Sequence, residues 1–466
     1  MGRTEPANGH LGRRAFLGAA VATGALLAKG PRAFAAAGAL AGDGAAVARY
    51  PLYVPPTIDL ATPFRLTAKP STIDLGDGRP SRAWVYNGSM PGPTLRARPG
   101  DVAQITLINH LSQKTITHWH GLQVDDRNDG HPRYAIPPGG TYRYSFPVAQ
   151  RAALNWYHPH PHMLTGKQVA LGLAGAFVVN DDEEDALGLP RGSHEVPLIL
   201  RDARLDRAGN LVYTPGRSDF LGDVAVVNGT RNPYLDVDTA LYRLRVLGGA
   251  NARVFQLALS TNDPLTLIGN DGGLLPSAVE VAELDVSPSE RVDLLVDFRG
   301  LPIGARVMLR DLRAGWDLLE FRVVRRLGVP ARIPATLSTI TPLGRPVRTR
   351  DFSFDGMTRI NGLEYDMNRV DFQVPFGRTE RWRFRTSGNA PHTVHVHGAP
   401  FQVTSRTGGR GRVFPWEAGW KDTVLLEDGE TVEVLIRFSA YRGEYLIHCH
   451  KLEHEDMGMM SNFEVV

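Results

Sequence analysis

One local signal occurs three times along the chain. The dipeptide Asn-Gly stands at residues 87–88, 228–229 and 361–362, and about 15–25 residues after each copy comes a strand-like segment, "ITLIN", "YRLRV" or "RWRFR". Asn and Gly are turn-forming residues, so each copy predicts a turn followed by a strand. Recurrence of such a unit indicates internal repeats of one fold. We therefore expect three similar β-sandwiches.

Short strand-like segments fill the rest of the chain. Segments such as "DVAQITLINH", "TYRYSFPV", "RVDLLVDF" and "TVEVLIRFS" alternate or run apolar over four to eight residues, with Gly, Pro and Asn between them. The 49 glycines and 33 prolines suit many short strands joined by turns. Even spacing of such strands predicts an all-β fold of sandwich domains, with short helices near 166–172 and 451–457.

Two segments have the composition of domain boundaries. One is the charged loop at 183–195, and the other is the segment rich in Pro and Arg at 325–350. They divide the chain into an expected first domain at 48–182, a second at 190–325 and a third at 345–466.

The N-terminus has the pattern of an export signal. Arg13 and Arg14 precede an apolar run from about 15 to 27, and an A-x-A pattern follows at 33–35. We expect residues 1–35 to be a twin-arginine signal peptide, which predicts a periplasmic, cell-envelope or secreted protein. The alternative, a membrane anchor, would need about 20 apolar residues. We expect no membrane span, and because no basic stripe alternates with aromatics, no nucleic-acid partner.

Eleven of the 15 histidines lie in four motifs, "HWHG", "WYHPHPH", "PHTVHVHG" and "HCHKLEH", and ten of them are candidate ligands, because His162 only extends the second motif. Each motif contains a His-x-His pair, and side chains two apart on a strand point to the same face. Eight imidazoles are too many for one metal of four to six ligands, but they fit a cluster of about three metals. The pairs are His118/His120, His158/His160, His395/His397 and His448/His450. The second Asn-Gly copy leads to "RVFQLALS", which has no histidine, so the middle domain is expected to lack ligands.

The only cysteine, Cys449, stands between His448 and His450. On a strand it must face away from these two neighbours, so it is expected to serve a different metal. His392 and His454 are the two motif histidines left over, and a His₂Cys site with a weak methionine ligand is the blue-copper arrangement for electron transfer.

Three methionines compete for the weak ligand position. Met459 lies five residues after His454, and Met457 and Met460 are close to it in sequence. Such a site would accept electrons singly from a reductant and pass them through Cys449 and its neighbours. The cluster would collect four electrons and reduce dioxygen to water. A lone His-x-His is more often a surface pair or a zinc site, but either interpretation leaves most of these histidines unexplained.

The four motifs in this order resemble the multicopper oxidase family, whose pattern is HxHG, HxH, HxxHxHG and HCHxxxHxxxxM. The resemblance runs from about Ala48 to the end of the chain. It implies three cupredoxin-like Greek-key β-sandwich domains and four copper ions per monomer. One departure is Thr393, where the family often has proline, but the ligand spacing is intact.

The resemblance also implies which residues hold each copper. The type 1 copper would be held by His392, Cys449, His454 and axial Met459. The type 2 copper would be held by His118 and His395. The binuclear type 3 pair would be held by His120, His158, His160, His397, His448 and His450.

Three carboxylates match acidic positions of the family. Asp129 matches an acid that assists proton transfer at the cluster, although "RNDG" is also a good turn by itself. Glu455 matches a proton-delivering glutamate, with a solvated surface charge as the alternative. Reduction of dioxygen to water consumes four protons, so acids are needed near a buried cluster. For Asp422, in "WKDTV", we expect a structural hydrogen-bonding role.

The expected activity is a laccase-like oxidation of phenols or aromatic amines with oxygen as acceptor, and we expect an open rim near His454 where electrons enter. Cuprous oxidases of the family often carry a methionine-rich insert and an Asp and a Met ahead of HxxHxHG. This chain has nine methionines in all, and Gly388 and Ala390 stand at those two positions. The alternatives are a Cu(I) or Fe(II) oxidase in copper tolerance and a non-enzymatic cell-envelope cupredoxin protein. Copper nitrite reductases lack the four His-x-His pairs.

Overall fold

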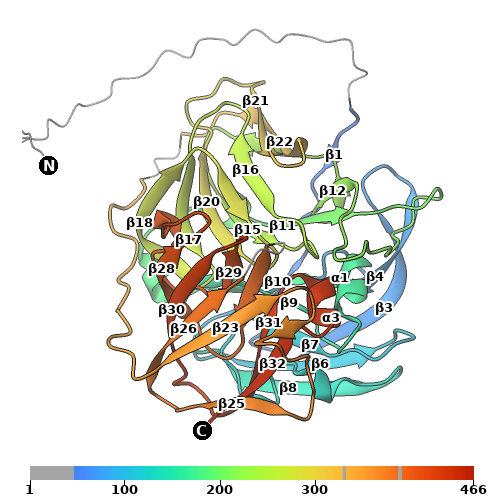
Figure 1. Cartoon of the computed structure of the whole chain (residues 1–466). Helices are drawn as coiled ribbons and strands as arrows, with labels where there is room; N and C mark the ends of the chain where they lie inside the picture. The colour runs from blue at the N-terminus through green and yellow to red at the C-terminus, as the bar shows by residue number, and fades with distance from the viewer. Residues whose placement is uncertain (1–46, 329–331, 387–390) are drawn as a thin grey trace, which may run out of the picture. The chain divides into compact units, whose positions relative to one another are not determined.

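The structure is a computed structural model that describes residues 47–328, 332–386 and 391–466 (Figure 1). Six β-sheets dominate the described residues, which confirms the predicted all-β fold. The α-helices are short: α1 (Thr165–Ala170), α2 (Asp182–Ala186) and α3 (Leu452–Asp456). Helices α1 and α3 lie where short helices are predicted. The predicted signal peptide at 1–35 lies outside the described residues.

The first pair of sheets, blue to cyan in Figure 1, forms a sandwich around a core that includes Trp119, Tyr144 and Phe177. One sheet has the order β4 (Pro80–Tyr86), β3 (Phe64–Asp74), β6 (Val102–Asn109) and β8 (Thr141–Pro147). The other has the order β2 (Thr57–Asp59), β5 (Thr94–Ala97), β10 (Gly175–Val179), β9 (Ala153–Pro159) and β7 (Thr117–His120).

The second pair of sheets, green to yellow in Figure 1 except for the blue strand β1, encloses a core that includes Leu244, Phe255 and Phe321. One sheet has the order β13 (Thr230–Arg231), β12 (Val224–Val227), β11 (Glu195–Ala203), β15 (Leu241–Gly248), β20 (Arg291–Asp297), β17 (Leu265–Asn270) and β18 (Gly273–Val281). The other has the order β1 (Tyr50–Pro51), β14 (Pro233–Asp238), β22 (Trp316–Arg325), β21 (Arg306–Asp311), β16 (Phe255–Leu259) and β19 (Leu284–Val286).

The third pair of sheets, orange to red in Figure 1, encloses a core that includes Trp382, Phe463 and Cys449. One sheet has the order β24 (Arg359–Ile360), β23 (Thr349–Asp355), β26 (Thr379–Arg385), β30 (Thr431–Arg437) and β28 (Phe401–Thr407). The other has the order β25 (Val370–Val374), β32 (Met460–Val465), β31 (Gly443–Cys449), β27 (His392–Val396) and β29 (Thr423–Leu426).

The Asn-Gly turns occupy the same place in each pair of sheets. Asn87, Asn228 and Asn361 have φ of 51°, 47° and 53°, and the glycine after each also has positive φ. Asn87 Oδ1 accepts the backbone N–H of Thr67 at 2.6 Å, and Asn228 and Asn361 accept from equivalent strand residues at 2.8 and 2.7 Å. The same side chain thus ties the same turn to its sheet three times, as the predicted repeat requires.

The repeat also shows why the middle domain carries no ligand. The strands with His-x-His motifs form antiparallel pairs, β7 with β9 and β27 with β31. In the second sandwich the equivalent antiparallel pair is β16 with β21, and both strands lack histidine. The second copy therefore has the same strand pair without histidine in it, and the absence of copper ligands from the middle domain stays a prediction.

No helix among the described residues has the length and apolar composition needed to cross a membrane.

Candidate metal centres

Three soft or borderline donor atoms converge in the core of the third sandwich. His392 is the first residue of β27, Cys449 is the last of β31, and His454 lies in α3. The Cys449 Sγ lies 3.4 Å from His392 Nδ1 and 3.6 Å from His454 Nδ1, and the two Nδ1 atoms are 3.2 Å apart. All three side chains are fully buried, so the group forms a closed three-donor site.

Burial prepares these donors for a cation. Loss of water lowers the pKa of His392 and of His454 to about 3, so both imidazoles are neutral near neutral pH and keep a lone pair. Burial raises the pKa of the Cys449 thiol to about 12, so a thiolate here needs a bound cation. Two neutral imidazoles and a thiolate are the donor set that copper prefers, so the residues fit this metal.

The three candidate methionines differ in burial. Met459 is fully buried and belongs to the same core as Cys449, and the Cys449 N–H donates to the Met459 carbonyl at 3.1 Å. Met457 is 38% exposed, and Met460 is paired with His448 across β31 and β32. These positions favour Met459, and its role as axial ligand stays a prediction.

The eight paired histidines meet between the first and third sandwiches. They come from the ends of β7 and β9 on one side and of β27 and β31 on the other, and all are buried. Seven of the eight fall into three overlapping groups, and within each group the ligand atoms lie within 4.8 Å of one another. These groups are His118–His120–His158, His118–His395–His397 and His160–His397–His448. The ring of His450 lies 5.0 Å from that of His120, so all eight form one cluster.

Two cluster imidazoles, those of His118 and His395, each use one nitrogen for a protein partner and leave the other nitrogen unpaired. His118 Nδ1 donates to the Asp129 carbonyl at 2.5 Å, and His395 Nδ1 donates to the Asp422 carbonyl at 2.8 Å. The Nε2 atoms of both are buried without a partner. Because an unpaired buried nitrogen is costly, converging unpaired nitrogens indicate a metal cluster, and the residues fit copper.

One segment of β31 joins the two centres. His448 points to the cluster, where its Nε2 lies 3.0 Å from His397 Nε2, whereas Cys449 faces the core and His392. The alternation predicted from the sequence is therefore present. The two centres are connected through consecutive residues of one chain segment.

Both predicted acids lie in the cluster wall. Asp129 is fully buried, and its Oδ2 accepts the Nδ1–H of His397 at 2.7 Å. Glu455 is buried, with carboxyl oxygens 3.6 Å from His160 Nδ1 and 3.3 Å from His448 Nδ1. Burial raises the pKa of both carboxyls well above the usual range. The alternative of a solvated surface charge at Glu455 is thus excluded by its burial.

His454 itself is fully buried, so the open rim expected near it does not expose this imidazole. A loop of the second sandwich covers it and places Asp219 Oδ1 3.4 Å from His454 Nε2. Asp219 keeps 17% of its side chain exposed and binds Lys451 Nζ at 3.2 Å. The sequence gives no sign of this contact, because a single Asp in a polar loop looks like a solvated charge.

The remaining described histidines have other surroundings. His131 is buried and contacts Asn462 Oδ1 at 3.0 Å, while His162 and His194 are partly exposed. None of them belongs to a donor group among the described residues. They therefore lie outside the donor groups of the cluster.

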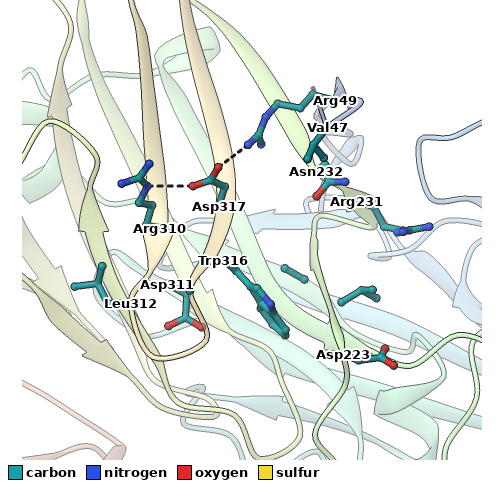
Figure 2. A pocket seen from close by; sticks show the side chains of 13 residues that line it. Val47, Arg49, Asp223, Arg231, Asn232, Arg310, Asp311, Leu312, Trp316 and Asp317 are labelled. Atoms are coloured by element: carbon teal, nitrogen blue, oxygen red, sulfur yellow. Dashed lines mark hydrogen bonds and ion pairs between the residues drawn. The ribbon is translucent and has the colours of Figure 1, made fainter. Parts of the chain in front are cut away.

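Two hollows differ in their position relative to the centres. A cavity of about 240 Å³ is lined by Gly121, Asn155, Trp420 and Asp422 and so borders the cluster. A larger pocket of about 530 Å³ lies on the second sandwich, where Arg49 and Arg310 both bind Asp317 (Figure 2). No histidine or cysteine lines this second pocket, so it is separate from both centres.

Comparison with known proteins gives consistent matches. Two family models, both described as multicopper oxidase, match residues 67–184 and 333–466. A multicopper oxidase of Staphylococcus haemolyticus is 35% identical over 409 residues, which cover 86% of this chain and 88% of that protein. The cell division protein FtsP of Escherichia coli is 33% identical over 416 residues, covering 84% and 87%.

A solved laccase structure from Pediococcus acidilactici has a TM-score of 0.84 and 34% identity, covering 90% of this chain and 94% of that one. Fold, donor groups and relatives agree with the resemblance carried by the four histidine motifs. The chain belongs to the multicopper oxidase family.

Proposed function

We propose that the protein is a laccase-like oxidase that removes single electrons from phenols or aromatic amines and reduces dioxygen to water. The observation that carries this proposal is the segment in which Cys449, a donor of one centre, is bonded to His448 and His450, donors of the other. A copper-storage protein or a single-metal enzyme would have no use for this connection.

The donor groups support the copper assignment in detail. His392, Cys449, His454 and Met459 would hold the type 1 copper. His118 and His395 would hold the type 2 copper, and the other six cluster histidines would hold the type 3 pair. Bound copper supplies one-electron transfer at the first site and reduction of dioxygen at the second.

Chain residues would supply the protons. Glu455 can hold a proton on its carboxyl between His160 and His448, and Asp129 sits against His397 on the other side of the cluster. Burial favours the protonated carboxyl, which is the form that a proton donor needs before the reaction. We assign proton delivery to these two residues.

The substrate would dock at Asp219, the partly exposed carboxylate beside His454. A phenol that loses an electron becomes strongly acidic, so a carboxylate that accepts its hydroxyl hydrogen bond assists the step. The absence of a methionine-rich insert argues against a dedicated Cu(I) site. Gly388 and Ala390 lie outside the described residues. The similarity to a Pediococcus acidilactici laccase supports the same choice.

The test is oxygen uptake by copper-loaded protein with a phenol, an aromatic amine, bilirubin, Fe(II) or Cu(I) as sole reductant. Turnover with phenols and amines is expected, and turnover with Cu(I) alone would show that the laccase proposal is wrong. Asp219→Asn should raise the KM for the phenol. Asp223→Asn, at an exposed carboxylate of the same loop outside the donor groups, is the matched control and should leave the KM unchanged.

We also propose export by the twin-arginine route, on the basis of Arg13 and Arg14 ahead of the apolar run. Replacement of both by lysine should retain the full-length chain inside the cell. Unchanged export of this variant would contradict the route.

A further inference from the structure

Arg291, on the sandwich that supplies no cluster histidine, uses all five of its side-chain N–H groups. It is the first residue of β20 and is fully buried. Its Nε donates to the Leu154 carbonyl at 3.1 Å, and Nη1 donates to the Ser289 carbonyl at 2.9 Å and to Asp422 Oδ1 at 2.7 Å. Nη2 donates to the Asp271 carbonyl at 3.1 Å and to Asp422 Oδ2. Such a guanidinium holds a carboxylate in one orientation.

Asp422 passes this orientation to two imidazoles. Its Oδ1 lies 3.1 Å from His120 Nε2, and its carbonyl accepts the His395 Nδ1–H at 2.8 Å. The two rings are stacked with centroids 3.7 Å apart. The atoms left unpaired are His120 Nδ1 and His395 Nε2. The Thr423 hydroxyl, which donates to Asp422 Oδ1 at 2.9 Å, lies 3.1 Å from the same His120 nitrogen and 3.3 Å from the same His395 nitrogen. Asp422, with this hydroxyl, therefore selects opposite ligand nitrogens on two neighbouring rings, since the hydrogen-bonded nitrogen of an imidazole determines which nitrogen is free for metal.

Arg291 also reaches the other half of the cluster. Leu154 lies on β9, the strand that carries His158, so the Nε contact fixes this strand relative to Asp422. The space for the guanidinium depends on Gly121, which follows His120. A Cβ there would lie 2.9 Å from Arg291 Nη2, and the φ of +93° already favours glycine. The local sequence after His120 thus accommodates an arginine from a different domain.

We propose that Arg291 is a positioning residue for the oxygen-reducing reaction, which sets the metal-facing nitrogens of His120 and His395 through Asp422. The inference rests on the proposed function, because it assigns the cluster to copper. The second sandwich, which has no ligand, then takes part in the chemistry by orienting ligands of the other two.

The competing explanation is that Arg291 is an ordinary buried ion pair between domains. Arg245 provides the matched control, because it is also buried on the second sandwich and binds Glu184 and Glu195, yet it contacts none of the cluster histidines. Arg245→Lys should weaken packing without changing the cluster. Arg291→Lys keeps the charge but loses the planar fork that grips the carboxylate.

The first measurement uses copper-free protein with ¹⁵N-labelled histidine, in which nuclear magnetic resonance reports which ring nitrogen carries the proton. In the wild type we expect His120 protonated at Nε2 and His395 at Nδ1. Arg291→Lys should give His120 a mixture of both forms, while Arg245→Lys keeps the wild-type pattern. A wild-type His120 protonated at Nδ1 would overturn the inference without any variant.

The second measurement is copper binding. Replacement of a residue that orients metal ligands typically weakens metal affinity by about 10- to 100-fold. The cluster of Arg291→Lys should therefore bind copper more weakly by about this factor, which is measured by the copper retained after dialysis. The blue colour of the Cys449 site should persist, which shows that the third sandwich is folded. Equal copper retention in Arg291→Lys and Arg245→Lys would overturn the inference.

Two outcomes separate this inference from the proposed function. Wild-type protein that binds no copper and shows no blue colour would reject the proposed function itself. Wild-type protein that is blue and active, with an unchanged Arg291→Lys cluster, would reject only the positioning role. If Arg291→Lys does not fold, Asp422→Asn is used instead, because it removes the charge that binds Arg291 and nearly keeps the shape of the side chain. This variant should also give His120 a mixture of the two singly protonated forms of its ring. An unchanged His120 in that variant counts against the inference.

Discussion

The Sγ of Cys449 lies 3.4 Å from Nδ1 of His392, although 57 residues separate the two in sequence. The contact exists because β27 and β31 are antiparallel neighbours, so that β27 begins with His392 at the end of the sheet where β31 finishes with Cys449. His448, the residue before Cys449, faces the other centre and is in register with His395 of β27. One pair of strands therefore supplies two of the three donors of the closed site and, at its ends, half of the histidine cluster.

The first prediction concerns Cys449→Ser. A hydroxyl is a poor copper donor compared with a thiolate, so the blue colour and turnover should both be lost. The side chain is fully buried in an apolar core, and a polar replacement should cost about 1–3 kcal/mol of stability. Visible absorbance, oxygen uptake and circular dichroism measure the three effects. Blue colour retained in the folded variant would contradict the assignment of copper to this site.

The second prediction concerns the methionines. Met459→Leu nearly conserves volume and should keep the fold, with a cost below about 1.5 kcal/mol. Because the axial ligand tunes the potential of such a site, loss of the thioether should raise the reduction potential of the blue copper. Met457→Leu, at a 38% exposed position, serves as the control and should leave it unchanged. The opposite result in a redox titration would assign the axial role to Met457.

Much of this arrangement could be predicted from the sequence, because the relevant signals are local. The Asn-Gly turns, the strand alternation and the His-x-His spacing each depend on residues close together in the chain. Strand periodicity alone places Cys449 opposite His448, and the structure agrees. The candidate copper ligands can therefore be recognised in the sequence as short motifs.

Asp219 and Arg291 could not be predicted, because their roles arise only when domains meet. Neither lies in a motif, and each acts on histidines more than 100 residues away through a contact between sandwiches, as the separation of 131 residues between Arg291 and Asp422 illustrates. A charged residue in a loop or at the start of a strand is usually solvated. The burial of His454 was missed for the same reason, since the loop that covers it belongs to another sandwich.

The third prediction concerns proton delivery by Glu455. Glu455→Gln keeps the shape of the buried carboxyl but cannot release a proton, so reoxidation of the reduced enzyme by oxygen should slow by about 10²- to 10⁴-fold. Reduction of the blue copper by a phenol should keep its rate, because Cys449 and its partners are untouched. Stopped-flow absorbance measures the two half-reactions separately.

Glu453 is the matched control for Glu455. It lies in the same helix and is buried, but its Oε1 accepts from Asn251 Nδ2 at 2.8 Å and from the Tyr213 hydroxyl, away from the cluster histidines. Glu453→Gln should reoxidise at the wild-type rate. Equal slowing in both variants would indicate that the helix, rather than the carboxyl of Glu455, governs the step.

The fourth prediction concerns acid stability through Glu184, which joins α2 to the second sandwich. Burial alone would raise the pKa of Glu184, but the guanidinium groups of Arg245 and Arg243 lower it to about 2 from 4.5. A carboxyl with a lowered pKa stabilises the folded protein above pH 4.5, and this contribution, about 3 kcal/mol, disappears as the pH falls toward 2. Denaturant unfolding across this pH range measures it.

Glu184→Gln should remove this acid dependence and, because it leaves two buried guanidiniums with one carboxylate partner fewer, cost about 3–5 kcal/mol at neutral pH. Asp185 is the control: its carboxylate also binds arginines, Arg98 and Arg191, but both it and they are partly exposed to water. Solvent screening reduces such a pair to less than about 1 kcal/mol, so Asp185→Asn should leave the acid transition unchanged. If both variants behaved alike, burial of the Glu184 pairs would not be the source of the acid sensitivity.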